Sequence, residues 1–223
     1  MKPIKESMPT ELEEQFFEEL FGRESKHPEK IETAKDLLFM LKNHHPPTYE
    51  HSLRVGLTTS EINKIIFLNP ETGLWGALHD IGKIKIPVSL LDKTTDFDDE
   101  DMRQMRLHTS MGYGLLKNEN LLFSAWIALT HHRYQGNSSY PSDGSLSLYP
   151  FPIKNASAET RLTGDETARI VSLADTYDAS HRANGRFGKP LTRIEIKEMM
   201  LKNNQSRQDL IEELYRRGTF KEN

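Results

Sequence analysis

Apolar residues recur every three or four positions along most of this chain, which is the spacing of amphipathic helices. Strand-like alternation of apolar and polar residues is nearly absent. We therefore predict an all-α fold. The predicted helices cover approximately residues 10–21, 28–45, 48–68, 71–82, 96–116, 120–131, 166–183, 192–202 and 206–217.

The first two helices are predicted to form an N-terminal extension, residues 1–46, packed on a main helical bundle of residues 47–223. Thr10 followed by Glu13 is typical of a capping box at a helix start. The apolar stripe that follows includes Phe16, Phe17 and Phe21. Core packing is the favoured explanation of this stripe, and a homodimer contact is the alternative.

Residues 134–163 form the longest stretch without a clear period, and they are rich in Ser, Gly, Pro and Asn. We predict a loop of nearly thirty residues here. Loops of this length in compact domains are usually functional or disordered. A lid over a site and a disordered insertion are both consistent with this composition.

Composition narrows the chemistry that the chain can perform. The 223 residues include 29 basic and 33 acidic side chains, so the formal charge of −4 provides no strong field for DNA, RNA or a membrane surface. No run approaches the ~20 apolar residues that span a bilayer, and a cytoplasmic protein is expected. The absence of cysteine excludes disulfides and thiolate ligands, which leaves histidine and carboxylates for metal binding.

The stretch from Leu78 to Lys83 places His79 beside Asp80 in an otherwise apolar segment. A buried carboxylate needs a cation or several hydrogen-bond donors, because an unpaired charge is costly in a low dielectric. A metal ion would satisfy both side chains at once. Taken alone, however, the pair is better explained by a mutual hydrogen bond or a helix cap.

Further histidines favour a metal site over this simpler explanation. Five of the nine lie on, or at the ends of, separate apolar helical segments, and two aspartates accompany them. These seven residues are His51, His79, Asp80, His108, His131, His132 and Asp175. Together they provide nitrogen and oxygen donors for two ions held between helices, where bundles commonly build metal sites. His27, His44, His45 and His181 lack this context and are interpreted as surface or structural residues.

The order of these residues resembles the HD-GYP branch of the HD superfamily of metal-dependent phosphohydrolases. The resemblance covers roughly residues 48–191. It depends on three motifs, which are the segment from His79 to Lys83, the pair His131-His132, and the segment from Ala174 to Ala179. Ordinary HD nucleotide phosphohydrolases generally lack the extra histidines.

The resemblance implies a binuclear centre in an HD-domain helical bundle. One ion would be held by His51, His79, Asp80 and Asp175, and the second by Asp80, His108, His131 and His132, with Asp80 bridging. Family members use iron or manganese, and zinc, nickel and magnesium are the alternatives. The implied substrate is cyclic di-GMP or a related cyclic dinucleotide, opened to a linear dinucleotide and in some cases cut to GMP. A diguanylate cyclase (GGDEF) domain is the implied protein partner.

The same resemblance suggests roles for residues around the metals. Lys83 would contact a phosphate or stabilise the leaving group, and Asp178 would position Lys83 or a metal-bound water. Tyr140 would contact substrate. Basic residues that would contact the second phosphate are Arg182, Arg186 and Lys189. For each charged residue, ordinary solvated surface charge is the alternative.

The chain departs from the family pattern at three positions. Arg133 stands where the family has an acidic residue, and Ser139 replaces the first glycine of the Gly-Tyr-Pro motif, whereas Tyr140 and Pro141 remain. Serine enters positive-φ conformations less readily than glycine, so the loop geometry is expected to differ. Pro47 occupies the place of a glutamate found in three-metal members, which predicts two metals here.

Three functions remain in competition on this basis. The leading one is a two-metal phosphodiesterase acting on cyclic dinucleotides. The second is a catalytically degenerate signalling or binding module, which the altered loop suggests. The third is another hydrolase such as a nucleotidase, or a di-iron oxygenase, because a fold does not fix a function.

Overall fold

The computed structural model describes residues 10–21, 28–135, 139–181 and 191–220. Within these ranges the chain contains no strand, which confirms the all-α prediction. None of the described helices has the length and apolarity needed to cross a bilayer. The α-helices are α1 (Glu11–Phe21), α2 (Pro28–His44), α3 (Pro46–Ile66), α4 (Thr72–Ala77), α5 (Val88–Leu91), α6 (Asp99–Asn118), α7 (Leu122–Thr130), α8 (Asp143–Leu146), α9 (Ala158–His181), α10 (Arg193–Asn203) and α11 (Gln208–Arg216). Short 3-10 turns connect some of them, namely η1 (Ile81–Lys85), η2 (His131–Tyr134) and η5 (Gln205–Arg207).

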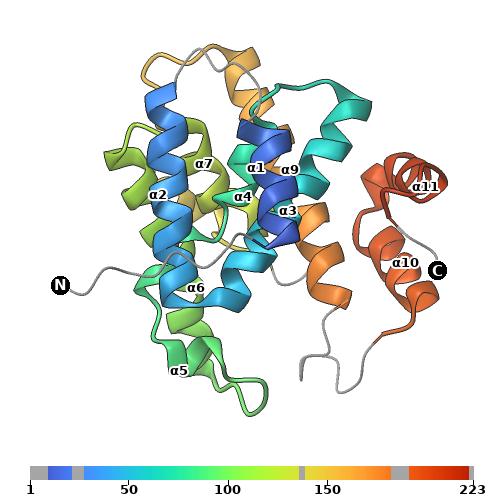
Figure 1. The fold of residues 1–223 in the computed structure, drawn as a ribbon, viewed down its shortest axis with the longest axis horizontal. Helices are drawn as coiled ribbons and strands as arrows, with labels where there is room; N and C mark the ends of the chain where they lie inside the picture. The colour runs from blue at the N-terminus through green and yellow to red at the C-terminus, as the bar shows by residue number, and fades with distance from the viewer. Residues whose placement is uncertain (1–9, 22–27, 136–138, 182–190, 221–223) are drawn as a thin grey trace.

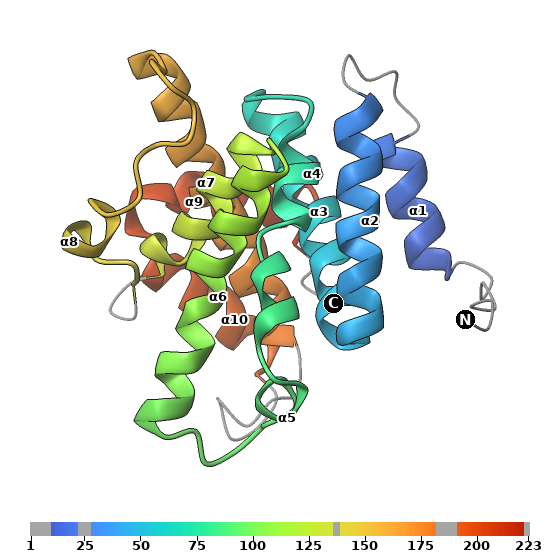
Figure 2. The same cartoon turned by 90° about the vertical axis from the view of Figure 1, so that its left-hand side faces the viewer.

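Helix α3 is central because its side chains enter both hydrophobic clusters. Leu53 packs in a cluster with residues of α1, α2, α4, α6 and α7. Val55 and Ile62 pack in a second cluster with residues of α7, α9, α10 and α11. Figure 1 shows α10 and α11 together on one side of the bundle, and Figure 2 shows α1 and α2 on its outer face. Segments distant in sequence therefore meet around α3.

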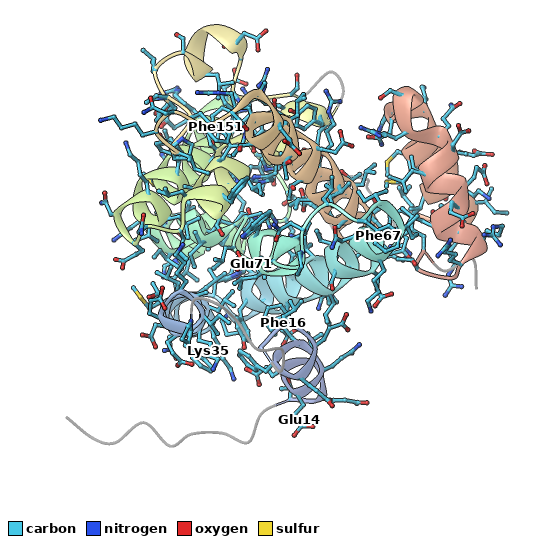
Figure 3. The ribbon with its side chains drawn as sticks, turned by 90° about the horizontal axis from the view of Figure 1, so that it is seen from above. Glu14, Phe16, Lys35, Phe67, Glu71 and Phe151 are labelled. Atoms are coloured by element: carbon cyan, nitrogen blue, oxygen red, sulfur yellow. The ribbon has the colours of Figure 1, made fainter. Side chains whose placement is uncertain are left out.

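The contacts that hold helix α1 on the bundle include one fully buried aromatic and one buried acidic side chain. Phe16 is fully buried in the first cluster, so core packing explains at least this member of the apolar stripe. Figure 3 shows Phe16 turned toward α3 and Glu14 turned away from the bundle. Glu13 is only 2% exposed, and the predicted capping box with Thr10 is confirmed. Its carboxylate also accepts hydrogen bonds from Lys42 Nζ at 2.5 Å and from Tyr49 Oη at 2.7 Å.

Replacing Glu13 with glutamine is expected to lower the free energy of unfolding by about 2 kcal/mol at neutral pH, because charge-assisted hydrogen bonds to α2 and α3 are weakened. Burial opposes ionisation of Glu13, but Lys42, the Thr10 amide and Tyr49 hold its pKa below the usual value. A depressed folded-state pKa contributes stability above the unfolded pKa, and this stability is lost as the pH falls through the folded value. The difference between variant and wild type should therefore shrink in acid.

Urea unfolding from neutral to acid pH measures this difference. The matched control is Glu14→Gln, one residue along on the exposed side of α1. A Glu13→Gln deficit that stays constant down to the lowest pH would contradict the charge-based explanation.

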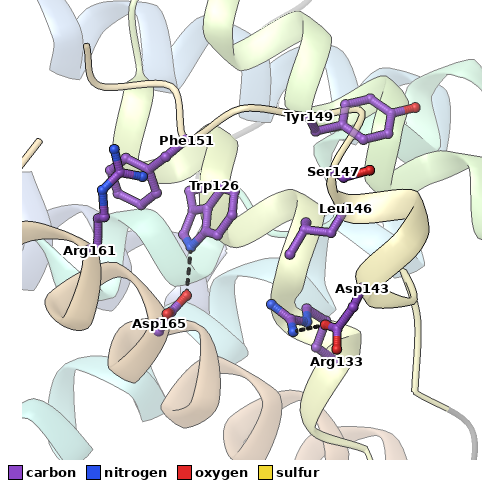
Figure 4. A pocket seen from close by; sticks show the side chains of 9 residues that line it. All are labelled: Trp126, Arg133, Asp143, Leu146, Ser147, Tyr149, Phe151, Arg161 and Asp165. Carbon is purple, nitrogen blue, oxygen red and sulfur yellow. Dashed lines mark hydrogen bonds and ion pairs between the residues drawn. The ribbon is translucent and has the colours of Figure 1, made fainter. Parts of the chain in front are cut away.

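The segment predicted as a loop over 134–163 contains more regular structure than its composition indicated. Helix α8 interrupts it, and α9 begins at Ala158 rather than near Glu166. The Ser157 hydroxyl accepts a hydrogen bond from the Thr160 amide at 3.0 Å, so it caps α9, whose exposed first turns carry no apolar period. Figure 4 shows Phe151 beside Trp126, their ring centroids 4.8 Å apart. This part of the segment therefore covers α7 as a packed layer.

Other predicted helix positions need correction. The helix expected to run to Gly82 ends at Ala77, and the chain continues through a tight turn into η1. Helix α3 begins before Thr48, because the His45 ring accepts a hydrogen bond from the Thr48 amide and proline occupies the first helical position. The apolar spacing of the expected helix 96–116 places Met102 toward the core, but Met102 is 41% exposed.

Candidate metal centre

The structure brings all seven predicted ligands into one buried cluster. His51 comes from α3, His108 from α6 and Asp175 from α9. The pair His79-Asp80 lies in the turn after α4, and His131-His132 begins η2 at the end of α7. His79 and His131 are fully buried, and only His132 is partly accessible. Residues 124 positions apart in the chain, from 51 to 175, thus face one centre.

Asp80 lies between two groups of donors, one facing each of its oxygens. Oδ2 is 3.6 Å from His51 Nε2 and 3.4 Å from His79 Nε2. Oδ1 is 3.3 Å from His108 Nε2 and 3.9 Å from His131 Nε2. Two sets of donor atoms each lie within 4.8 Å of one another, namely His51, His79 and Asp175, and His108, His131 and His132. A third set within the same distance joins His79, Asp80 and His131, so Asp80 lies between the first two sets. The division into two ions that the family resemblance implied stays a prediction.

Hydrogen bonds behind the rings determine which nitrogen of each imidazole faces the centre. The Nδ1 atoms of His79 and His108 lie 2.7 Å from the Gly76 carbonyl and 2.6 Å from the Met105 carbonyl. His131 Nδ1 lies 3.0 Å from the Ala128 carbonyl. A carbonyl only accepts, so each Nδ1 donates and a neutral ring presents its Nε2 lone pair to the centre. Metal-ligating histidines are commonly held in this way.

The centre contains polar atoms that the protein does not satisfy. Among the described residues, the buried atoms without a hydrogen-bond partner include His51 Nε2, His79 Nε2, Asp80 Oδ1, His108 Nε2 and His131 Nε2. Unpartnered buried polar atoms are unfavourable and rare in folded proteins. Their convergence fits one or more cations, because every one of these atoms offers a lone pair in the geometry described.

The electrostatics of the cluster also favour a cation. Burial lowers the pKa of His108 to about 3, and burial together with His132 holds the pKa of His131 well below its usual value. Burial disfavours the charged form of Asp80, but Lys83 and His79 hold its pKa well below the ordinary range. At His79 the nearby Asp80 and Asp175 outweigh burial and raise the pKa. The lowered pKa values favour neutral imidazoles at His108 and His131 beside the ionised carboxylate of Asp80, which is a suitable set of ligands for a divalent ion.

Asp178 lies behind His51 rather than beside Lys83. Its carboxylate accepts from His51 Nδ1 at 2.7 Å and from Arg54 Nε at 2.6 Å. Burial would raise its pKa, but His51 and Arg54 lower it to about 2. Lys83 Nζ instead donates to Asp80 Oδ2 at 2.5 Å. The hypothesis that Asp178 positions Lys83 therefore gives way to one in which Asp178 orients His51.

Two supporting residues were missed by the sequence analysis. Arg54 follows His51 by three positions on α3, and this spacing was a usable signal. Gln135 had no such signal, because only the fold brings it to α9. Its amide nitrogen donates to Asp175 Oδ2 at 2.9 Å, and its Oε1 lies 2.6 Å from His132 Nδ1. Gln135 therefore links the two groups of donors.

The predicted substrate-binding residues have different outcomes. The Tyr140 ring stacks on His132 with centroids 4.5 Å apart, and the Arg106 guanidinium lies 5.2 Å from the Tyr140 ring centroid. Tyr140 is therefore at the edge of the centre. Arg182, Arg186 and Lys189 lie outside the described residues.

Asp178→Asn is expected to weaken divalent metal binding by roughly 10- to 100-fold, because an amide holds the His51 ring less firmly than a carboxylate. Competition with a fluorescent chelator measures this affinity. Glu159→Gln, an exposed carboxylate on the same helix, serves as the control. Unchanged affinity in Asp178→Asn would show that the contact with His51 does not support metal binding.

The chain is similar in sequence to several curated proteins. The chain is 34% identical over 129 residues to the cyclic di-GMP phosphodiesterase response regulator RpfG of Xanthomonas campestris, covering 56% of this chain and 28% of that protein. It is 32% identical over 139 residues to a cyclic di-GMP phosphodiesterase of Thermotoga maritima, covering 59% and 34%. It is 29% identical over 191 residues to the 3'3'-cGAMP-specific phosphodiesterase 2 of Vibrio cholerae, covering 76% and 32%. The chain thus spans about a third of the length of these curated relatives.

A solved structure has a similar fold. The HD domain of the phosphodiesterase PgpH from L. monocytogenes, in complex with cyclic-di-AMP, superposes with a TM-score of 0.52 at 22% identity, over 84% of this chain and 86% of that one. The family model described as HD domain matches residues 48–180, more than half of the chain. The resemblance read from the sequence is confirmed, and this chain belongs to the HD domain family.

Proposed function

We propose that this chain is a two-metal phosphodiesterase of the HD-GYP type that hydrolyses cyclic di-GMP or a related cyclic dinucleotide. The product would be the linear dinucleotide, with further cleavage to GMP as an additional step. The observation that carries the proposal is the arrangement of two imidazole-rich donor groups around the two oxygens of Asp80. The relatives named as cyclic dinucleotide phosphodiesterases support the choice of substrate class.

Iron and manganese are the proposed metals. A ligand set of imidazole and carboxylate without thiolate suits these ions, and also zinc and nickel, better than it suits magnesium. His51, His79, Asp80 and Asp175 would hold one ion, and Asp80, His108, His131 and His132 the other. A bound pair of divalent ions would stabilise the attacking and leaving oxygens of an in-line displacement at phosphorus.

The protein residues contribute positioning and charge. Hydrogen bonds from Nδ1 hold the imidazole rings in place, so the donor atoms need little reorganisation. The Lys83 side chain is 20% exposed, and its ammonium contacts the buried carboxylate of Asp80. We infer that Lys83 contacts the scissile phosphate or the leaving oxygen. Tyr140, stacked between His132 and Arg106, would border the substrate.

Elemental analysis combined with product analysis tests the proposal. Purified protein is expected to contain two metal ions per chain and to release linear dinucleotide from cyclic di-GMP, other cyclic dinucleotides or both. Metal without release from any cyclic dinucleotide or mononucleotide would favour a binding module. Release from mononucleotides only would favour a nucleotidase. A diguanylate cyclase partner, a homodimer and a cytoplasmic location stay predictions.

A further inference from the structure

Two surface cavities flank the turn η2, which carries two of the proposed metal ligands, and Arg133 lines both. The first has a volume of about 370 Å³ and is shown in Figure 4. Its charged groups have partners within the cavity, since Arg133 pairs with Asp143 at 2.5 Å and Trp126 Nε1 donates to Asp165 at 3.0 Å. Arg161 lies over the Phe151 ring. Balanced charges give this cavity no preference for an anion.

The second cavity has a volume of about 410 Å³ and a different electrostatic character. It lies between η2, α9 and the end of α10. Four basic side chains line it, namely Arg133, Arg169, Lys202 and Arg207, and none of its lining residues is acidic. Neutral donors from Asn203 and Ser206 complete the same wall. Apart from Leu173, the lining is therefore composed of residues that can donate hydrogen bonds to an anion.

Two of the four cations have carboxylate partners, and two do not. Arg133 pairs with Asp143, which is 90% exposed, and Arg207 pairs with Glu166 of α9. Within the part of the chain that the structure describes, Arg169 and Lys202 have no carboxylate at ion-pair distance. An excess of about two positive charges remains. A phosphate monoester carries about −1.5 to −2 charges at neutral pH, which matches this excess.

Among the described residues, one of the two unpaired cations of the cavity is held by an aromatic ring. The Arg169 guanidinium lies 4.2 Å from the centroid of the Tyr134 ring. This cation–π contact holds the guanidinium against a partly buried aromatic, so less side-chain freedom is lost when a ligand binds. Leu173 contributes an apolar wall from the same helix. The volume lies within the ~300–1,000 Å³ typical of small-molecule sites and exceeds what a phosphate ion alone would fill.

We propose that this cavity binds the phosphate monoester of a nucleotide, at a site separate from the metal centre. Arg169 and Lys202 would contact the phosphate oxygens, and Asn203 and Ser206 would offer further hydrogen bonds to the ligand. Within η2 and the residue after it, Arg133 and Tyr134 line the cavity, whereas His132 and Gln135 join the metal centre. The binding does not depend on hydrolysis, so it can be tested independently of the proposed reaction.

Isothermal titration calorimetry with GMP, guanosine and inorganic phosphate tests the site on the full chain, both as purified and after removal of metal with a chelator. We expect GMP to bind in both preparations and guanosine not to bind. Lys202→Gln and Arg169→Gln are each expected to weaken GMP binding roughly tenfold or more. The controls are Lys154→Gln and Arg193→Gln, two exposed basic residues away from the cavity. They should bind as the wild type does.

The outcomes separate the possible ligands. Inorganic phosphate that binds as tightly as GMP, and is lost in the same variants, would assign the cavity to a free phosphate. Lys202 is exposed, so its variant tests the site even if Arg169→Gln proves unstable by thermal unfolding. Equal GMP affinity in wild type and Lys202→Gln, loss of binding on metal removal, or binding of guanosine as tight as that of GMP would each overturn the proposal.

Discussion

Replacing Asp80 with asparagine is expected to reduce the proposed phosphodiesterase activity on the order of 10³-fold or more and to lower the bound metal below two ions per chain. The reason is geometric, since the two oxygens of Asp80 face the two separate donor groups. The asparagine amide has one acceptor oxygen and an NH2 group that only donates, and it carries no charge. Metal ions contribute several kcal/mol of transition-state stabilisation, and each 1.36 kcal/mol corresponds to about a tenfold change in rate.

The measurement combines metal content by elemental analysis with the initial rate of linear dinucleotide formation. Asp36→Asn, an exposed carboxylate on α2, is the matched control and should retain both metal and activity. Because asparagine is nearly isosteric with aspartate, thermal unfolding should detect an intact fold in the Asp80 variant. Full activity with two bound ions would exclude Asp80 as the bridging residue.

Replacing Gly82 with alanine is expected to destabilise the protein by about 3 kcal/mol, which corresponds to a fall in melting temperature of roughly 10 °C. An added Cβ would lie 1.9 Å from the His108 carbonyl oxygen and 2.6 Å from the Gly112 amide nitrogen. Both of these are backbone atoms of α6, so relief requires η1 to move away from that helix. Such a shift separates Asp80 from His108, and metal affinity should fall together with stability.

The matched control, Gly114→Ala, is expected to change the free energy of unfolding in the opposite direction. Gly114 lies on α6 only two residues beyond Gly112, and a Cβ there would meet nothing within 4 Å. Alanine at this helical position should therefore stabilise the protein by about 0.5–1 kcal/mol, because it restricts the unfolded chain more than glycine does. Thermal and urea unfolding of both variants measure these changes in stability. Equal stability of Gly82→Ala and wild type would show that η1 and α6 are not packed this closely.

Gly82 shows what the sequence could predict about the site and what it could not. The segment from His79 to Lys83 indicated a metal-dependent phosphohydrolase, but the sequence predicted a continuous helix there. Periodicity reports only which residues face an apolar neighbour. Periodicity does not indicate that the backbone of α6 approaches Gly82 closely. This close approach is possible because residue 82, within the turn η1, has no Cβ.

The segment after η2 also shows that local sequence patterns do not report tertiary contacts. The Ser, Gly and Pro content of this segment predicted a long loop. Its Tyr149 and Phe151 nevertheless pack against the first cluster, which includes Tyr113 of α6 and Trp126 of α7. Isolated aromatics without a period carry no local signal of burial. Their packing partners lie on α6 and α7, so only the assembled bundle determines that they are covered.

The sequence by itself determined the all-α class, the approximate positions of most helices and the identities of the seven donor residues, because apolar period and residue chemistry are local properties. The tertiary structure decided which Asp80 oxygen faces which histidines, that the rings present Nε2, and that Asp178 and Gln135 support them. It also created the cationic cavity between η2, α9 and α10. These features depend on contacts between residues far apart in the chain, and their distances are set only when the helices pack around α3.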